Sequence, residues 1–211
     1  MKKSDLKYID FWNERYQDLN FAYGKEPNLF FKKELQKLKT GSILLPADGE
    51  GRNGVYASKL GWDVTATDLS IEGKSKALKL ANEFDTNLKY VVGDIQDLEF
   101  PKESFDAIGL IYAHFTAWKI SAIHQKLVTL LKSGGYIIFE AFSENHLKYQ
   151  ADNPKIGGPK DINMLFSLEQ IQQDFTGFEI QVLEEKEVTL NEGVCHNGKG
   201  SVIRFIGKKI S

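Results

Sequence analysis

A glycine-rich turn at residues 49–54 is the feature of this chain most able to do chemistry. The apolar run 43–45 before it is typical of a strand, and a helical pattern over 55–60 begins directly after it. Glycine lets a backbone approach a ligand closely, and the first turn of a helix offers unpaired N–H groups and the positive end of a dipole. The run 63–67 predicts a second strand, which Asp68 closes with a carboxylate suited to ribose hydroxyls. These residues predict a site for a nucleoside cofactor.

This turn is typical of two classes of enzyme. Gly49, Gly51 and Gly54 satisfy the spacing G-x-G-x-x-G, and Asp68 lies 19 residues after the first glycine. This is the fingerprint of dinucleotide binding, so an NAD(P)-binding Rossmann oxidoreductase is one interpretation. Against it, the sequence has no Tyr-x-x-x-Lys pair and no second domain for a substrate. The chain also closes with two β-rich runs, which suit a hairpin better than a second mononucleotide-binding half.

A second acidic turn favours a different cofactor. Gly93 and Asp94 directly follow the predicted strand 88–92. At that sheet edge the Asp94 carboxylate can accept a hydrogen bond from an adenine amino group, and a backbone N–H, such as that of Ile95, can reach a ring nitrogen. The glycine turn, Asp68, Gly93-Asp94, Phe105-Asp106 and the run Leu-Lys-Ser-Gly-Gly at 131–135 resemble, in this order, a class I S-adenosylmethionine-dependent methyltransferase.

A narrower resemblance is to the tellurite-resistance and thiopurine methyltransferase-like group. It rests on Phe-Trp-Asn-Glu-Arg-Tyr at 11–16, Phe-Ala-Tyr-Gly-Lys-Glu-Pro-Asn at 21–28, and Glu-Gly-x-x-His-x-Gly at 192–198. It implies S-adenosylmethionine as cofactor, S-adenosylhomocysteine as product, and a small-molecule methyl acceptor such as a thiol or chalcogen compound. The first strand departs from the broader class, because Leu45 and Pro46 stand where most members carry an acidic residue. Which group binds the methionine ammonium is therefore open.

The predicted methyl transfer requires mainly that the nucleophile, the methyl group and the sulfur lie in line. A sulfonium already activates the methyl group, so in-line geometry supplies most of the rate. A general base is needed only if the acceptor must lose a proton, and a thiolate need not. His114 follows the strand 105–112, where α/β sheets open toward ligands, and is predicted as a substrate-side base or else as a helix-start histidine. His124 is expected on a helix surface, and His196 in a loop.

The predicted cofactor residues lie in the N-terminal segment, in the glycine turn and at strand ends. They are Trp12, Arg15, Tyr16, Tyr23, Asp48, Gly49, Glu50, Gly51, Asn53, Asp68, Leu69, Ser70, Asp94, Ile95 and Tyr112. For several of them a structural role is the alternative: the aspartates could cap helices, and the aromatic residues could be core. A protein that binds the cofactor only as a sensor or interaction module also remains open.

The alternation of patterns predicts an α/β fold: a Rossmann-like, doubly wound, mostly parallel seven-stranded sheet with a C-terminal antiparallel hairpin and helices on both faces. The expected helices are 4–16, 29–38, 52–60, 71–83, 117–131 and 167–175; the expected strands are 42–45, 63–67, 88–92, 105–112, 136–142, 178–190 and 201–208. A single methyltransferase domain, 1–211, is expected. In it 1–38 is a helical segment that covers the cofactor, 42–142 is the cofactor-binding core, and 143–211 supplies a substrate-side loop, a helix and the hairpin.

Composition limits the remaining classes. The formal charge is −2 with scattered basic residues, so neither nucleic acid nor an anionic membrane is an expected partner. No apolar run approaches the roughly 18–20 residues of a membrane-spanning helix, and the polar N-terminus is unlike a signal peptide. Cys195 is the only cysteine, which excludes an internal disulfide and a Cys-rich zinc site. We expect a cytoplasmic protein without a metal, either a monomer or a homodimer.

Overall fold

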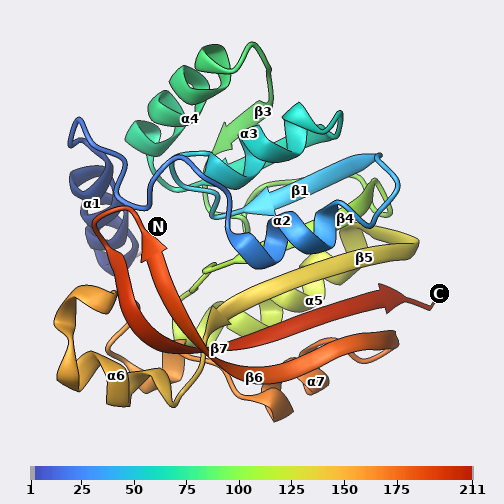
Figure 1. Cartoon of the computed structure of the whole chain (residues 1–211). Coiled ribbons are helices and arrows are strands. Elements are labelled where there is room, and N and C mark those ends of the chain that lie inside the picture. The colour runs from blue at the N-terminus through green and yellow to red at the C-terminus, as the bar shows by residue number, and fades with distance from the viewer. Residues whose placement is uncertain (1–2, 211) are drawn as a thin grey trace.

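A computed structural model describes residues 3–210. Its centre is a seven-stranded sheet in the order β3-β2-β1-β4-β5-β7-β6 (Figure 1). The strands are β1 Ser42–Pro46, β2 Asp63–Asp68, β3 Lys89–Val92, β4 Phe105–Ile111, β5 Leu131–Phe142, β6 Phe178–Glu192 and β7 His196–Lys209. β1 to β5 pair in parallel, whereas β7 is antiparallel to both β5 and β6. The predicted topology, including the C-terminal hairpin, is confirmed.

Helices cover both faces of the sheet. They are α1 Lys3–Tyr16, α2 Leu29–Leu35, α3 Arg52–Lys59, α4 Ile71–Glu83, α5 Ile120–Leu130, α6 His146–Asp152 and α7 Leu168–Asp174, with short 3-10 turns η1 Ala117–Lys119, η2 Pro154–Ile156 and η3 Ile162–Met164. Strand β1 shows why two layers form: Leu44 packs in the core under α5 and α7, while Ile43 and Leu45 pack under α2, α3 and α4. Side chains alternate along a strand, so a strand apolar at every position needs cover on both faces.

The sheet is longer at two places than the sequence pattern predicts. β5 begins at Leu131 instead of 136, with a register shift opposite Phe105. Lys132 in this extension donates to both carboxylate oxygens of Asp106 at 2.9 Å, and Asp106 also accepts from the Ser42 backbone N–H. The hairpin joint, expected over 191–200, is reduced to 193–195 because β6 and β7 keep pairing to their tips.

Two helical predictions need correction. The expected helix 117–131 is divided into η1 and α5, and the stretch 144–164, expected as a loop, contains α6, η2 and η3. α6 packs against β7, and its residue His146 is completely buried against Phe142 with the ring centroids 3.7 Å apart. This contact joins residues of α6 and β5 and leaves no periodic signal in the local sequence.

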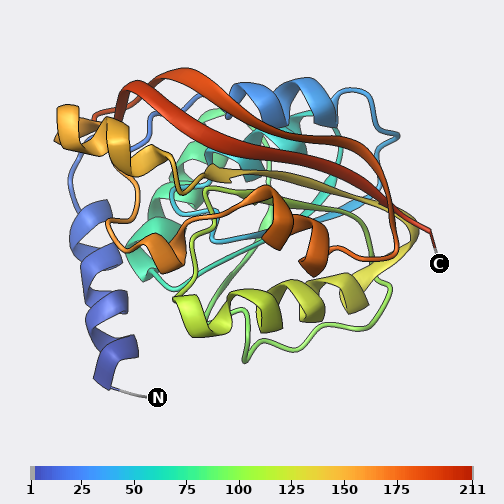
Figure 2. The ribbon, with the colours of Figure 1, turned by 90° about the horizontal axis from the view of Figure 1, so that it is seen from below.

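α1 stands apart from the two helical layers. It packs against α4 at the end of the sheet toward which the β1 arrow points, and the view from below shows it along one side of the molecule (Figures 1 and 2). Among the helices of residues 3–210, none has both the length and the apolar character to cross a bilayer. α1 is thus placed over the carboxyl ends of the parallel strands, where the predicted site residues lie.

Candidate active site

A cavity of about 1010 Å³ opens at the carboxyl ends of β1, β2 and β4. Its wall contains most of the residues predicted from sequence: Trp12, Arg15, Tyr16, Tyr23, Asp48, Gly49, Glu50, Asn53, Asp68, Leu69, Asp94, Ile95, Tyr112 and His114. The volume is at the upper end of the roughly 300–1,000 Å³ of small-molecule sites. It has room for a nucleoside cofactor together with a second small molecule.

Gly51 and Ser70 are brought near the cavity but are not part of its wall. Gly51 adopts a φ of 85° at the start of α3, and a Cβ there would lie 2.5 Å from the Cβ of Ala77 on α4. Ser70 caps α4 by accepting from the Gly73 N–H at 3.0 Å, and donates to Asn13 of α1 at 2.6 Å. In the structure Gly51 permits the close packing of α3 on α4, and Ser70 caps α4.

Gly49 does need to be glycine at the cavity wall. Its φ is 57°, and a Cβ would lie 2.6 Å from the Tyr16 hydroxyl. The Gly49 carbonyl accepts a hydrogen bond from the buried Tyr90 hydroxyl, so β3 holds the turn in place. The backbone therefore passes closely under α1 and presents its polar groups to the cavity.

Two carboxylates are buried beside this turn. Asp68 is 8% exposed; its Oδ2 accepts from the Gly49 N–H at 3.1 Å and its Oδ1 from the Ser70 N–H at 2.9 Å. Burial raises its pKa to about 6, against the lowering effect of these backbone hydrogen bonds. Asp48 accepts from the Gly54 N–H at 3.1 Å, and burial raises its pKa well above the usual range. Each carboxylate has about four lone-pair directions, so both can accept further donors from a ligand.

Glu50 and Asn53 have their side chains turned to the N-terminal segment. Glu50 accepts from the Ala22 N–H at 2.8 Å and forms an ion pair with Lys76 at 2.6 Å. Asn53 accepts from the Asn28 N–H at 3.0 Å. These bonds fix residues 22–28 against the glycine turn, and they place the loop beside the cavity.

Asp94 also lines the cavity, after the end of β3. Its Oδ2 pairs with Lys119 at 2.6 Å, and its Oδ1 accepts from the Gln96 N–H at 2.9 Å. Ile95, which follows it, is 4% exposed and belongs to the core under α5. The carboxylate is thus fixed at the rim of the sheet next to an apolar wall, as a flat purine ring would require.

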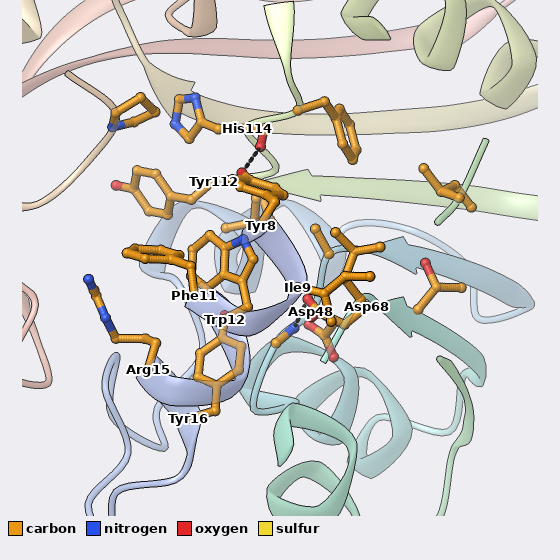
Figure 3. Close-up of a pocket in the computed structure, with 18 of the residues that line it drawn as sticks. Tyr8, Ile9, Phe11, Trp12, Arg15, Tyr16, Asp48, Asp68, Tyr112 and His114 are labelled. Atoms are coloured by element: carbon orange, nitrogen blue, oxygen red, sulfur yellow. Dashed lines mark hydrogen bonds between the residues drawn. The ribbon is translucent and has the colours of Figure 1, made fainter. Parts of the chain in front are cut away.

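α1 closes the cavity with aromatic side chains (Figure 3). Trp12 stacks on Tyr16 with centroids 5.4 Å apart, and the Tyr8 hydroxyl donates to the His114 carbonyl at 2.9 Å. Tyr16 is 4% exposed, and burial raises its pKa well above the usual range. Since Asn13 also bonds to Ser70, α1 is tied to both sides of the cavity.

Arg15 joins α1 to the hairpin tip. Its guanidinium donates to the Tyr23 hydroxyl and to the Cys195 Sγ, each at 3.3 Å, and lies over the Phe11 ring. Burial raises the Tyr23 pKa to about 12, although Arg15 lowers it, so the hydroxyl stays neutral. Arg15 therefore brings a guanidinium cation to this part of the cavity, where it is held by a hydroxyl and a sulfur.

Another part of the cavity, next to Tyr23, is lined with rings. Tyr112, Phe142 and His196 have centroids 4.7–5.2 Å apart. His196, expected in a loop, lies on β7 at 4% exposure and holds Glu192 through Nδ1 at 3.1 Å. Sequence reasoning weighed His196 as a loop residue because nothing local indicates that the hairpin folds back over the end of β4.

The position of His114 does not suit the role of a base. Its Nδ1 lies 2.8 Å from the Met164 carbonyl and its Nε2 lies 3.4 Å from the Phe142 N–H, so both ring nitrogens face backbone groups. Burial also lowers its pKa to about 4, against the raising effect of the Met164 carbonyl. The geometry makes His114 a neutral wall of the cavity, and argues against the predicted substrate-side base.

His124 is a clear correction. Predicted on a helix surface, it is completely buried, with Nδ1 2.8 Å from Asp174 and its ring stacked 5.0 Å from Phe175. α7 packs over α5 and covers this face. Within residues 3–210, no group of three or more His, Cys, Asp or Glu side chains is arranged to hold a metal ion.

Comparison with known proteins agrees with this arrangement. Residues 46–139 match the model of the family described as methyltransferase domain. This segment begins at the end of β1 and ends within β5, so it contains the glycine turn, Asp68 and Asp94.

Several solved structures share the fold over most of the chain. One, from work on the conversion of a disulfide bond into a thioacetal group during echinomycin biosynthesis, has 17% identity, a TM-score of 0.77, and coverage of 96% of this chain and 92% of its own. TehB from Haemophilus influenzae has 16% identity, a TM-score of 0.70, and coverage of 95% and 66%. Magnesium protoporphyrin IX methyltransferase (ChlM) from Synechocystis PCC 6803, solved with bound S-adenosylhomocysteine, has 13% identity, a TM-score of 0.68, and coverage of 97% and 99%.

Proposed function

We propose that the chain, which matches a methyltransferase domain over residues 46–139 and shares the fold of S-adenosylmethionine-dependent methyltransferases, methylates a small, soft nucleophile, a thiol or another chalcogen compound. The single observation that carries this proposal is the shape of the cavity. The glycine turn, Asp68 and Asp94 form one end of it, and the rings of Tyr112, Phe142 and His196 form another.

The residues at the first end fit the cofactor. Gly49 lets the backbone of the turn pass close under Tyr16 at the cavity wall, and Asp68 has acceptor capacity beyond its two backbone bonds. Asp68 would hold the ribose hydroxyls, and Asp94 with the Ile95 N–H would hold the adenine. Arg15 would pair with the methionine carboxylate. When bound, S-adenosylmethionine supplies a methyl group already activated by the sulfonium.

The α1 segment is proposed as a lid. The faces of Trp12, Tyr16 and Tyr23 would attract the sulfonium by about 0.5–2 kcal/mol through their ring quadrupoles. The bonds from the Tyr8 hydroxyl to the His114 carbonyl and from the Ser70 hydroxyl to the Asn13 oxygen would hold the lid shut and exclude water.

The ring-lined end favours a soft acceptor. Burial lowers the pKa values of His114 and His196, so both rings are neutral near pH 7. Polarisable sulfur packs well beside aromatic rings. A thiolate needs no general base, which agrees with the engaged ring nitrogens of His114. The likeness to TehB is a further, indirect support.

A panel assay tests the proposal. The protein is incubated with labelled S-adenosylmethionine and with thiols, selenols, tellurite or small amines, and release of S-adenosylhomocysteine is followed. We expect turnover with thiols or chalcogen compounds and little with amines. Faster turnover of amines would refute the acceptor class, and tight binding of S-adenosylhomocysteine without turnover of any acceptor would favour a sensor. The Asp68→Asn variant controls for background release.

A further inference from the structure

Glu140 is a buried carboxylate that the proposed chemistry does not use. It lies on β5 at 2% exposure, and three donors reach it: the Asn28 Nδ2 at 2.6 Å, the Arg204 Nε at 2.6 Å and the Tyr112 hydroxyl at 3.2 Å. A charge buried in a sheet is costly unless it is paired and hydrogen-bonded. Arg204 forms an ion pair with Glu140. The other two donors are Tyr112, on the cavity wall, and Asn28, next to the cavity.

The first of these is Tyr112, on the cavity wall. It has a φ of 52°, an unusual conformation for a bulky side chain, which persists only where its surroundings fix it. Glu140 fixes it twice: its carbonyl accepts from the Tyr112 N–H at 2.7 Å, and its carboxylate accepts from the hydroxyl. The Tyr112 ring lies 4.7 Å from both Phe142 and His196. Its position therefore sets the shape of the ring-lined end.

The second is Asn28, which caps α2 through its side-chain oxygen. Its Nδ2 also donates to the Glu192 Oε1 at 3.3 Å. Glu192 in turn accepts from the His196 Nδ1 and pairs with Arg52 at 2.9 Å. Although burial would raise the Glu192 pKa, the pairing with His196 and Arg52 lowers it to about 2, so this carboxylate remains ionised.

We propose that Glu140 is a positioning residue for the acceptor, acting through the Tyr112 hydroxyl and through Asn28 and Glu192 on His196. Glu192 holds the hydrogen on Nδ1 of His196, which leaves Nε2 as the accepting nitrogen. Glu140 thus positions two walls of the acceptor end: Tyr112, which follows β4, and His196, on the hairpin. This inference rests on the proposed function only in taking the ring-lined end as the acceptor site.

A double-mutant cycle tests the link with Tyr112. The variants are Glu140→Gln, Tyr112→Phe and the combination, and Glu185→Gln, an exposed carboxylate on β6 two strands away from β5, is the control. We expect Glu140→Gln to reduce kcat/KM for the acceptor by roughly 10- to 100-fold, as for small misplacements of a substrate. The Kd for S-adenosylhomocysteine should change less than about twofold, since the Asp68 end is separate. A glutamine has one accepting oxygen, and we expect it to stay with the Arg204 Nε, which leaves the Tyr112 hydroxyl without its acceptor. The double variant should then be hardly worse than Glu140→Gln alone, because Tyr112→Phe removes the same bond.

A measurement without turnover keeps the test independent of the proposed function. Ring ¹⁵N shifts of His196, with S-adenosylhomocysteine bound, report its tautomer, and we expect Glu140→Gln to shift the population away from the Nδ1–H form while Glu185→Gln does not. Additive losses in the cycle, or S-adenosylhomocysteine affinity falling in step with activity and melting temperature, would show a merely structural Glu140. An unchanged His196 tautomer would also overturn the inference. Failure to find any acceptor, with the tautomer shifted, would instead count against the proposed function alone.

Discussion

Replacing Asp68 by asparagine should weaken the binding of S-adenosylhomocysteine and remove a pH dependence from it. Asp68 is 8% exposed at the end of β2, and burial raises its pKa to about 6. Asparagine keeps the shape and one accepting oxygen for the Gly49 and Ser70 N–H groups. It lacks the charge that two ribose hydroxyls would meet.

The magnitude follows from these contacts. Hydrogen bonds to a charged group contribute about 1.5–3 kcal/mol each, and asparagine retains part of that, so we expect a loss of about 2–4 kcal/mol. Each 1.4 kcal/mol is a factor of ten, which gives an increase in Kd of roughly 30- to 1000-fold. Because hydroxyl donors favour the ionised carboxylate, the wild-type Kd should also rise as the pH falls below about 6, by up to about tenfold per unit.

The free energy of unfolding of the ligand-free protein should fall as the pH rises, whereas binding of S-adenosylhomocysteine should strengthen. The folded-state pKa of Asp68 is raised from 3.8 to about 6, so its contribution is fully present below about pH 4 and is lost as the pH rises through about 6. The shift corresponds to about 3 kcal/mol. The free energy of unfolding of the wild type should therefore fall over this window relative to that of Asp68→Asn.

Calorimetric titration with S-adenosylhomocysteine at pH 5, 6, 7 and 8 measures the binding, and urea unfolding at the same pH values measures the stability. Asp63→Asn, which removes an exposed carboxylate from the start of the same strand, is the control. The pKa of the nearby Asp48 is raised in part by the Asp68 charge, so the difference between the two proteins reports Asp68 together with its effect on Asp48. Equal pH dependence of Kd in wild type and Asp68→Asn would refute the assignment of ribose binding to this carboxylate.

Three further outcomes are expected. S-adenosylhomocysteine should bind far more tightly than NADH in calorimetry; tighter NADH binding would contradict the cofactor assignment. Gly51→Ala should lower the free energy of unfolding by about 1–3 kcal/mol more than Gly61→Ala does. Both glycines have a positive φ, but only a Cβ at residue 51 would lie within 2.5 Å of Ala77. Equal urea midpoints for the two variants would exclude the clash. Proteolysis within 20–25 should slow when S-adenosylhomocysteine is added; an unchanged rate at saturation would argue against the lid.

Local patterns were sufficient for the framework of the site. The alternating apolar pattern, glycine stops and polar breaks predict the order of the elements, because periodicity and turn chemistry act over a few residues. The bounds of α4 agree with the predicted 71–83, and Asp68 closes β2 as expected. Parallel strands bring their carboxyl ends to one edge, so the pattern also predicted that Gly49, Asp68 and Asp94 would line one cavity.

What the sequence by itself determined is therefore the doubly wound sheet and the place of the glycine turn, Asp68 and Asp94 at one cavity, where each element carries its own signal. Only the tertiary structure decided the ring-lined part of the cavity and the buried polar groups. His196 reaches Tyr112 from 84 residues away, and His124 is buried because α7 packs over it. Gly51 has no room for a side chain because Ala77 of another helix packs against it. Glu140 accepts hydrogen bonds from donors in three separate segments. Such contacts depend on which surfaces meet after folding, and no spacing within a single element records that.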